Sequence, residues 1–565
     1  MTGTRGASAR DGRGNMLEGL DAVDWRGLDP DLPATDLAKV LRRIARADAA
    51  TPRDAVERAY GQLQELLLSR GRFTDAGTAS LPFLVDLALD ADTVGRPDAV
   101  DVLASLAHNR AAGDDASTDA GWDAAWRRQW PRLRRLLGDR DPEVRRAALQ
   151  LIADRTGPLL ERWRVETDLS VRVTLLLALG EAAASEDRAG ATADEVCAVL
   201  DAAFHGEDRV LRVAAVIATC FLDPQAALRA CPMLLDILCD PALAPEFGRV
   251  WYTLNCEYPY DRGSVAGWVV GLLERDTGVA ISFVAGLAEA GNRTGDADLR
   301  RCALDEAWRL LERRPSAADT FLPMAAGLLT DPDDDVRYKA THLLAVIGRR
   351  AAPYADRLAA LLDDTGESQF FDGTVGEHAR WALTRIGDPR ALPDLVERLV
   401  EPYRDMPGRG YGISDPRQPD VVDVLTPLHA HAEVLLPAVR EALRDEVARS
   451  GWLVGQLRDV LQAWGEDPVL PGETTTHAQP WSPPLMTPAE AESVVLASAP
   501  DGEPIGPFVT ALSSLIHHGR TTTPVREALA ALRDADIRLS QYGDYRTFLQ
   551  DEEIREQMDA VLALP

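Results

Sequence analysis

The stretch Asp333-Asp-Asp-Val336-Arg337 shows the repeating phrase of this chain: an Asp, an aliphatic residue three positions later, and an Arg directly after it. The same spacing returns in Asp141-Pro-Glu-Val144-Arg145, Asp168-Leu-Ser-Val171-Arg172 and Asp208-Arg-Val-Leu211-Arg212. A phrase that recurs within 565 residues is typical of a protein built from repeated structural units. The repetition therefore predicts the architecture before any catalytic motif is considered.

Each copy of the phrase predicts the start of an amphipathic helix. An Asp at the N-cap accepts a hydrogen bond from a free backbone N–H, and Pro142 and Glu143 both suit a first helical turn. Small and aliphatic residues then follow at helical spacing, as in Val336, Ala340 and Leu343. The Arg of the phrase is well placed to pair with an Asp of the neighbouring repeat, so we interpret these Arg residues as a structural ladder.

A second phrase predicts the other helix of each unit, because it sets a Pro in the first turn of an apolar helix. It occurs as Leu81-Pro82, Cys231-Pro232, Leu322-Pro323, Leu392-Pro393 and Leu436-Pro437. Gly387-Asp388-Pro389 joins the two phrases, with a Gly to end one helix and an Asp to cap the next. The alternation of the two phrases predicts stacked antiparallel helix pairs.

The two phrases resemble HEAT repeats, and they are most similar to the short bacterial type found in phycobilin lyases. The residues that carry the resemblance are Asp333, Val336, Arg337, Ala340, Leu343, Leu344 and Gly348, followed by Val375, Ala379, Ala382, Leu383 and Gly387-Asp388-Pro389. Clear copies cover residues 139–240 and 320–400. The whole chain is also similar to large actinobacterial HEAT-repeat proteins that have no assigned activity. The resemblance implies an all-α fold, a right-handed α-solenoid of stacked antiparallel helix pairs, to which we expect a C-terminal helical cap to be added.

Composition divides the chain into four predicted parts. Residues 1–33 form a disordered or irregular tail, residues 34–465 the HEAT-like solenoid, residues 466–489 a Pro/Thr-rich linker, and residues 490–565 a helical cap or small module. Helical spacing in the last part covers 505–517, 523–533 and 545–564. We favour a cap because a stack of repeats needs a terminal unit with one polar face.

The net charge of the chain disfavours some classes of partner. A formal net charge of -29 disfavours nucleic acid and anionic membranes, because both attract Lys and Arg. A basic protein or peptide would instead be steered toward this chain. No apolar run is long enough to span a membrane, and the six cysteines, which lack any Cys-x-x-Cys motif, predict buried free thiols in a reducing cytoplasm.

Catalytic motifs are weak, so we expect no catalytic residue, metal site or cofactor. HEAT folds include deoxyhypusine hydroxylase, in which His-Glu pairs hold two irons, but only Glu377-His378, in reversed order, occupies a matching place here. The enzyme alternative is an activity in the concave groove, on a small molecule or on DNA as in the HEAT-like alkylpurine glycosylases, which use Trp, Asp and Arg. The stripe Trp122, Trp126 and Trp130 has core spacing, which favours packing.

Three interruptions of the repeats predict partner contact, at residues 251–262, 366–373 and 402–419, because long loops and mixed aromatic and polar groups mark recognition surfaces. The candidate partner-binding residues are Trp251, Tyr252, Tyr258, Tyr260, Phe370, Phe371, Tyr403, Arg404, Arg409 and Tyr411. The sequence thus predicts a cytoplasmic, non-enzymatic scaffold or inhibitory partner that binds a basic protein or peptide through its concave face and inserted loops.

Overall fold

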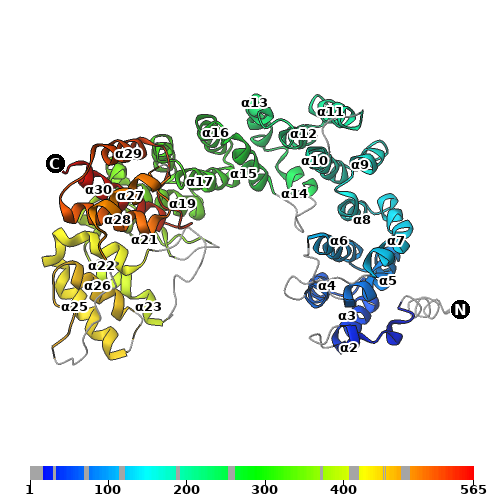
Figure 1. The fold of residues 1–565 in the computed structure, drawn as a ribbon, viewed down its shortest axis with the longest axis horizontal. Helices are drawn as coiled ribbons and strands as arrows, with labels where there is room; N and C mark the ends of the chain where they lie inside the picture. Colours follow the sequence, from blue (N-terminus) through cyan, green and yellow to red (C-terminus); the bar gives the residue numbers. More distant parts are fainter. Residues whose placement is uncertain are drawn as a thin grey trace. The chain divides into compact units, whose positions relative to one another are not determined.

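In a computed structural model the chain is helical, as predicted (Figure 1). The described residues are 17–28, 34–68, 75–112, 121–185, 191–251, 261–368, 373–405, 419–449, 451, 453–471, 484–499 and 501–565. Among them there is no β-strand, only an isolated antiparallel bridge between Glu367 and Thr374. The chain divides into two compact units, Met1–Leu273 and Glu274–Pro565. The fold is therefore an all-α solenoid.

Unit 1 contains the helices up to α15. Their bounds are η1 Leu20–Ala22, α2 Trp25–Leu28, α3 Ala34–Arg46, α4 Arg53–Leu67, α5 Asp75–Leu89, α6 Arg96–Ala112, α7 Trp122–Leu133, η3 Arg134–Gly138, α8 Pro142–Ala148, η4 Leu149–Ile152, α9 Thr156–Trp163, α10 Leu169–Ser185, α11 Ala191–Phe204, α12 Arg209–Cys220, α13 Ala226–Leu238, α14 Ala244–Val250 and α15 Arg262–Leu273. Helices α4, α6, α8, α10 and α12 pack in succession as one row, and α5, α7, α9, α11 and α13 accompany them.

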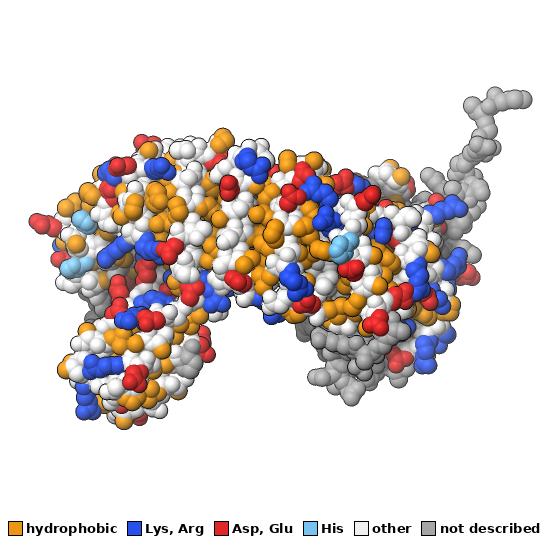
Figure 2. Space-filling model, turned by 90° about the horizontal axis from the view of Figure 1, so that it is seen from above, with side chains coloured by type: hydrophobic (Ala, Val, Ile, Leu, Met, Phe, Trp, Pro, Cys, Tyr) orange, Lys and Arg blue, Asp and Glu red, His pale blue; other side chains and the backbone are white. Residues whose placement is uncertain are grey.

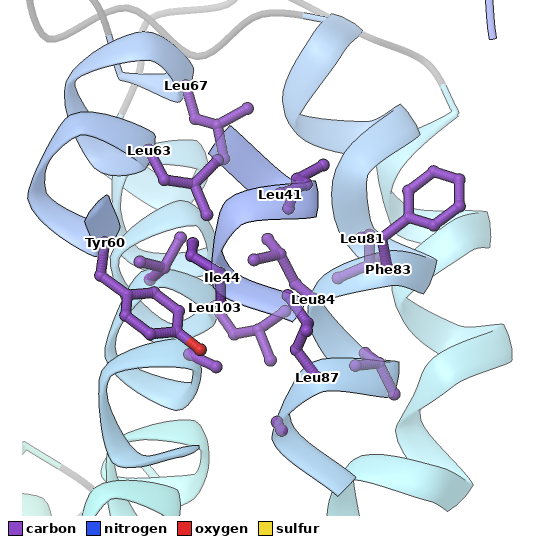
Figure 3. Packing of buried hydrophobic residues seen from close by; sticks show 14 of the residues in the cluster. Leu41, Ile44, Tyr60, Leu63, Leu67, Leu81, Phe83, Leu84, Leu87 and Leu103 are labelled. Carbon is purple, nitrogen blue, oxygen red and sulfur yellow. The ribbon is translucent and has the colours of Figure 1, made fainter. Parts of the chain in front are cut away.

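The core of unit 1 forms where successive helix pairs meet. Leu41 and Ile44 of α3, Leu63 of α4 and Leu84 of α5 converge in one cluster, and each is at most 1% exposed (Figure 3). Each repeat buries its apolar stripe only against its neighbours, as expected for a solenoid. None of the described helices is long and apolar enough to cross a membrane.

Unit 2 contains helices α16 to α30. Their bounds are α16 Thr277–Thr294, α17 Ala297–Leu311, η5 Pro315–Ala317, α18 Ala318–Leu328, α19 Asp334–Ile347, η6 Gly348–Tyr354, α20 Ala355–Ala359, α21 Val375–Ile386, η7 Pro389–Ala391, α22 Leu395–Val400, α23 Pro402–Asp405, α24 Val421–Leu425, η8 Thr426–His431, α25 Ala432–Arg449, α26 Val454–Ala463, α27 Pro488–Ser498, α28 Ile505–His518, α29 Thr523–Asp534 and α30 Arg546–Leu562. Helices α28, α29 and α30 confirm the three helical stretches predicted near the C-terminus.

The C-terminal helices contact the repeats of unit 2 through polar groups as well as through packing. The Tyr545 hydroxyl donates to Asp423 Oδ2 at 2.6 Å, and the Arg385 guanidinium donates to both carboxylate oxygens of Glu552 at 3.0 and 2.8 Å. Behind these contacts, the helices have their own apolar core. Part of the predicted linker, 472–483, lies outside the described residues, and the domain boundaries stay a prediction.

The Asp of each phrase caps a helix, as predicted. Asp333 Oδ1 accepts from the backbone N–H of Val336 at 3.0 Å, Asp208 caps α12 at 2.9 Å, and Asp141 caps α8 at 2.9 Å. Asp168 accepts from the N–H of Val171 at 3.3 Å. These bonds satisfy N–H groups that would otherwise lack a partner at the start of a helix.

The predicted Arg ladder is confirmed for Arg337 and takes other forms at Arg145 and Arg172. Arg337 donates to the Asp364 carboxylate at 2.8 and 3.1 Å, whereas Arg145 pairs with a Glu, Glu166, at 2.9 and 3.0 Å. The Arg172 guanidinium instead lies over the Trp163 ring at 4.3 Å. The Arg of the phrase thus pairs with a carboxylate from a later segment in two copies and packs on a ring of the preceding helix in a third.

The second phrase is placed wrongly by the sequence. Pro82, Pro232, Pro323 and Pro437 lie inside α5, α13, α18 and α25, whose helices begin several residues earlier. A Pro removes one backbone hydrogen bond, and burial of the flanking apolar residues compensates for that loss. Only Pro393 precedes its helix, α22.

The contact between α10 and α12 requires a glycine. A Cβ atom added to Gly180 would lie 2.3 Å from the carbonyl oxygen of Ala218, well inside van der Waals contact. We expect Gly180→Ala to lower the free energy of unfolding by about 1–3 kcal/mol, because the two helices must separate. Gly271→Ala in α15 is the matched control, since no atom lies within 4 Å of its added Cβ, and helix propensity should raise stability by about 0.5–1 kcal/mol. Thermal unfolding of both variants distinguishes these outcomes, and equal melting temperatures would contradict the close approach.

Glu166 makes the stability of the fold depend on pH in the acidic range. Burial alone would raise the pKa of Glu166, but hydrogen bonds from Arg145 and from the backbone N–H groups of Asp168 and Thr167 outweigh it and lower the pKa to about 2. Its stabilisation is therefore present above the unfolded pKa of about 4.3 and is lost as pH falls through about 2.

We expect Glu166→Gln to cost about 2 kcal/mol at neutral pH, with the difference from wild type shrinking as the pH falls from about 4 to about 2. Glu161→Gln changes an exposed carboxylate of α9 and should have little effect at any pH. Melting temperatures over a pH series test this; a constant difference would show that Glu166 stabilises by packing alone.

Candidate functional site

A pocket of about 340 Å³ opens in unit 2 at the N-terminal end of α21. Its walls come from the segment 362–365, from α21 and α22, and from the beginnings of α23 and α24. Thr365 and Thr374 flank one loop predicted to bind a partner, and Pro402, Tyr403 and Pro419 belong to another. This cavity, called here the α21 pocket, therefore lies where two of the predicted loops meet the repeats.

The N-terminus of α21 is held in place by reciprocal hydrogen bonds. Thr374 Oγ1 accepts from the N–H of Glu377 at 3.2 Å, and Glu377 Oε2 accepts from the N–H of Thr374 at 2.8 Å. This capping box satisfies two backbone donors at once. The N–H of Gly376 donates to the carbonyl oxygen of Asp364 at 2.9 Å, a contact so close that an added Cβ would lie 2.9 Å from the same oxygen.

The apolar surface of the α21 pocket combines buried and half-buried residues. Trp381, Leu395 and Val424 are each at most 2% exposed. Leu399 and Tyr403 are half-buried and line the same space. The pocket thus offers aromatic and aliphatic surface that remains in contact with solvent, a composition typical of binding sites.

Two arginines, Arg380 and Arg398, are the cationic side chains that line the pocket. Arg380 is 8% exposed and donates from Nη1 to the carbonyl oxygens of Ala391 and Pro393, each at 3.0 Å. Burial lowers the pKa of Arg380, and the nearby charge of Arg398 lowers it further. Within the described part of the chain, no carboxylate forms an ion pair with either guanidinium.

The acidic groups at the pocket are differently engaged. Asp364 accepts from Arg337 and from the N–H of Gly366, and the Arg337 hydrogen bond is the main reason why the pKa of Asp364 is lowered. Glu377 belongs to the capping box, whereas Asp363 is exposed. The pocket can therefore hold an apolar side chain while its arginines donate to oxygen acceptors.

The predicted partner-binding residues have different outcomes. Tyr403 lines the α21 pocket. Trp251 is fully buried and its ring packs on Phe247 at 5.9 Å between centroids, so it belongs to the core, and its assignment to a binding surface was wrong. Arg404 lies in α23, but its side chain is not described. The remaining candidates lie outside the described residues: Tyr252, Tyr258, Tyr260, Phe370, Phe371, Arg409 and Tyr411.

The sequence reasoning missed Arg380, Trp381, Arg398 and Leu399, which form much of the pocket. Each occupies an ordinary helical position, and its neighbours come from segments distant in sequence. The available signal was weak: an Arg next to a Trp on an apolar helix face.

The His of the reversed pair Glu377-His378 packs in the buried core. His378 is fully buried, and its Nδ1 lies 3.1 Å from Nδ1 of His342, with the Tyr338 ring 4.4 Å away. Burial, with the effect of His378 second, lowers the pKa of His342 well below its usual range. No group of three His, Cys, Asp or Glu that could hold a metal ion occurs among the described residues.

The structure also bears on the predicted Trp stripe and on the predicted burial of the cysteines. Trp122, Trp126 and Trp130 stack in sequence, with centroid distances of 5.3 and 6.4 Å, and Trp122 is buried, which agrees with packing. The described cysteines are free thiols, but Cys197 is exposed, so the prediction that all are buried was wrong. Its position on an outer helix, facing a groove instead of a neighbouring helix, explains the exposure.

The capping box at the pocket is open to a direct test. We expect Thr374→Ala to lower the free energy of unfolding by about 1 kcal/mol, because the N–H of Glu377 loses its acceptor. Thr365→Ala, at an exposed position in the same pocket, is the control and should leave stability unchanged. Thermal melts measure both changes; equal effects of the two substitutions would contradict the role of the cap.

Comparison with known protein families identifies the repeat type of one part of the chain. The family model described as HEAT repeats matches residues 321–406, which include α19, α21 and most of the pocket. No curated protein matches the sequence. A solved structure of Kap95p binding to RanGDP has a TM-score of 0.32 and 12% identity, and the match covers 93% of this chain and 67% of that chain.

A crystal structure of a Kap121p mutant likewise has a TM-score of 0.32 and 12% identity, and the match covers 99% of this chain and 55% of that chain. This chain therefore spans about half the length of that protein. The fold of the present chain follows from its own helices and from the family match. Residues 321–406 carry HEAT repeats.

Proposed function

We propose that this chain is a protein-binding scaffold or inhibitory partner, and that the α21 pocket anchors an extended segment of a basic partner protein. The observation that supports this most directly is the half-buried pair Leu399 and Tyr403 beside the two arginines. Aromatic anchors with nearby polar donors are typical of the residues that dominate binding energy at protein interfaces.

The arginines suit the backbone of such a segment. Arg380 already donates to two backbone carbonyls, Ala391 and Pro393, and so shows the geometry of carbonyl recognition. Arg398 is exposed and lines the same space, where it can donate to a carbonyl of the partner. An extended peptide carries carbonyl groups that need donors once they leave water.

The net charge supports a basic partner and a steering role. A protein of net charge -29 attracts a positively charged protein over distance, which raises the association rate. At the pocket itself, Asp363 is an exposed carboxylate that can meet a Lys or Arg flanking the anchored residue. Specificity then comes from the apolar anchor, whereas the net charge of the chain raises the rate of encounter.

Affinity capture with the full chain tests the proposal. Tagged wild type is compared with Tyr403→Ala and Leu399→Glu, and retained proteins are quantified by mass spectrometry. We expect the variants to retain the principal partner about tenfold less, because each loses an interface anchor. Tyr354→Ala is the control, since Tyr354 is a half-buried tyrosine of the same unit that does not line the pocket.

Two outcomes would contradict the proposal. One is retention of nucleic acid in place of protein by the wild-type chain. The other is a partner retained equally by wild type, Tyr403→Ala and Leu399→Glu, which would place its binding elsewhere on the chain.

A further inference from the structure

A second hollow lies in unit 1, between α11 and α13 and above α12. Both outer helices pack on α12. The space has a volume of about 420 Å³, within the range of binding pockets. Hydrophobic side chains gather on the face that unit 1 turns toward the viewer in Figure 2, where α11 and α13 lie. We call this hollow the α11–α13 groove.

One face of α11 forms a wall of the groove. Cys197, Leu200, Asp201 and Phe204 follow one another at positions i, i+3, i+4 and i+7, so they share one side of the helix. Leu200 is 2% exposed, while Phe204 is half-buried and Cys197 is exposed. Apart from Asp201, this stripe has the apolar spacing of a helix that packs on another helix.

The opposite wall explains why the stripe is not covered. The residues of α13 that line the groove are Ala226, Arg229 and Ala230; the two Ala side chains are short, and Arg229 pairs with Asp223. Val216 of α12 and Leu222 close the bottom of the space. Two helices of one outer layer are thus held apart over an apolar floor, which leaves room for further apolar side chains.

Carboxylates mark the edge of the groove. The Asp201 side chain is 75% exposed, His205 Nδ1 lies 3.3 Å from its Oδ1, and no Lys or Arg is paired to it in the described residues. Asp194, on the same face of α11 beyond the lining residues, and Glu207, after the helix, are also exposed. Asp223 is paired with Arg229 on the other side. The edge along α11 is therefore acidic.

We infer that the α11–α13 groove binds an amphipathic helix of a partner protein, with the apolar face of that helix against Phe204 and Leu222 and its Lys or Arg residues beside Asp201. An amphipathic helix laid in an apolar groove is a recurring mode of peptide recognition. The acidic edge and the charge of the whole chain select a basic helix. A second copy of this chain fits less well, because two chains of net charge -29 repel. The inference does not depend on the α21 pocket, because every lining residue belongs to unit 1.

Two synthetic peptides test the inference on the full-length chain. The first, of about 18 residues, carries Leu at i, i+3, i+4 and i+7 spacing with Lys on its other face; the second keeps the Leu positions and replaces Lys by Glu. Fluorescence anisotropy at about 0.15 M salt measures binding. We expect the Lys peptide to bind at least about tenfold more tightly than the Glu peptide.

Substitutions assign the binding to the groove. Phe204→Glu and Phe204→Ala should each weaken binding of the Lys peptide about tenfold, and Asp201→Lys should weaken it and reduce its salt dependence. The matched control is Phe221→Glu, because Phe221 is 37% exposed at the end of α12 and does not line the groove. Binding by Phe221→Glu should stay within about twofold of wild type. Phe204→Ala introduces no charge, so it keeps the test valid if Phe204→Glu fails to fold.

Several results would overturn the inference. The first is the absence of binding of the Lys peptide at about 0.1 mM, and the second is equal binding of the two peptides. The third is unchanged affinity in Phe204→Ala with a wild-type melting temperature, which would show general attraction to an acidic surface. Sedimentation showing self-association of wild type that Phe204→Ala abolishes would assign the groove to a second copy instead.

Discussion

The bond between Arg337 and Asp364 is the contact on which the α21 pocket depends. Arg337 belongs to the repeated phrase, and its guanidinium also donates to the carbonyl oxygen of Asp331 at 2.8 Å, so it is fixed from two sides. Asp364, in turn, offers its backbone carbonyl to the N–H of Gly376. One charge pair between repeats thus positions both the segment that forms a wall of the pocket and the helix that follows. Ion pairs of this bidentate kind carry geometric specificity in addition to energy.

The structural roles of the phrase residues also explain why different repeats expose different side chains. The phrase residues cap helices and connect neighbours, and these roles occupy their polar groups. The two binding surfaces that we propose lie where a repeat departs from the pattern. At α21 the departure is a pair of inserted loops, and at α11 and α13 it is a pair of Ala residues where larger side chains would close the layer. The first surface carries the guanidinium groups of Arg380 and Arg398, and the second has Asp201 at its edge.

Much of the fold could be predicted because it depends on local chemistry. The Asp residues at 141, 168, 208 and 333 cap helices since an Asp can accept from N–H groups two or three residues ahead. The positions of four of the five Pro phrases were wrong for the opposite reason: they depend on packing and not on local chemistry. Pro82 lies within α5 because burial of its flanking residues Leu81 and Phe83 favours a longer helix, and this gain comes from distant segments.

The predictions for the candidate site also separate into those that depend on local sequence and those that depend on packing. Trp251 stands in a stretch of mixed aromatic and polar residues that resembles an interface, but only three-dimensional packing decides whether such a ring faces Phe247 or solvent. Tyr403, which lines the pocket, was among the predicted partner contacts because its segment interrupts the repeats, and its role in binding stays a prediction. Trp381 lines the same pocket but was not predicted, because it occupies a regular helix position.

The sequence by itself determined the helical period, the capped starts of the phrase helices, the repeat family of residues 321–406 and the acidic charge, because each follows from spacing or composition. Only the tertiary structure decided that Arg380, Leu399 and Tyr403 border one pocket and that Ala226 and Ala230 leave α11 uncovered. A pocket is made of distances between side chains of different helices, and those distances follow from how the helices pack.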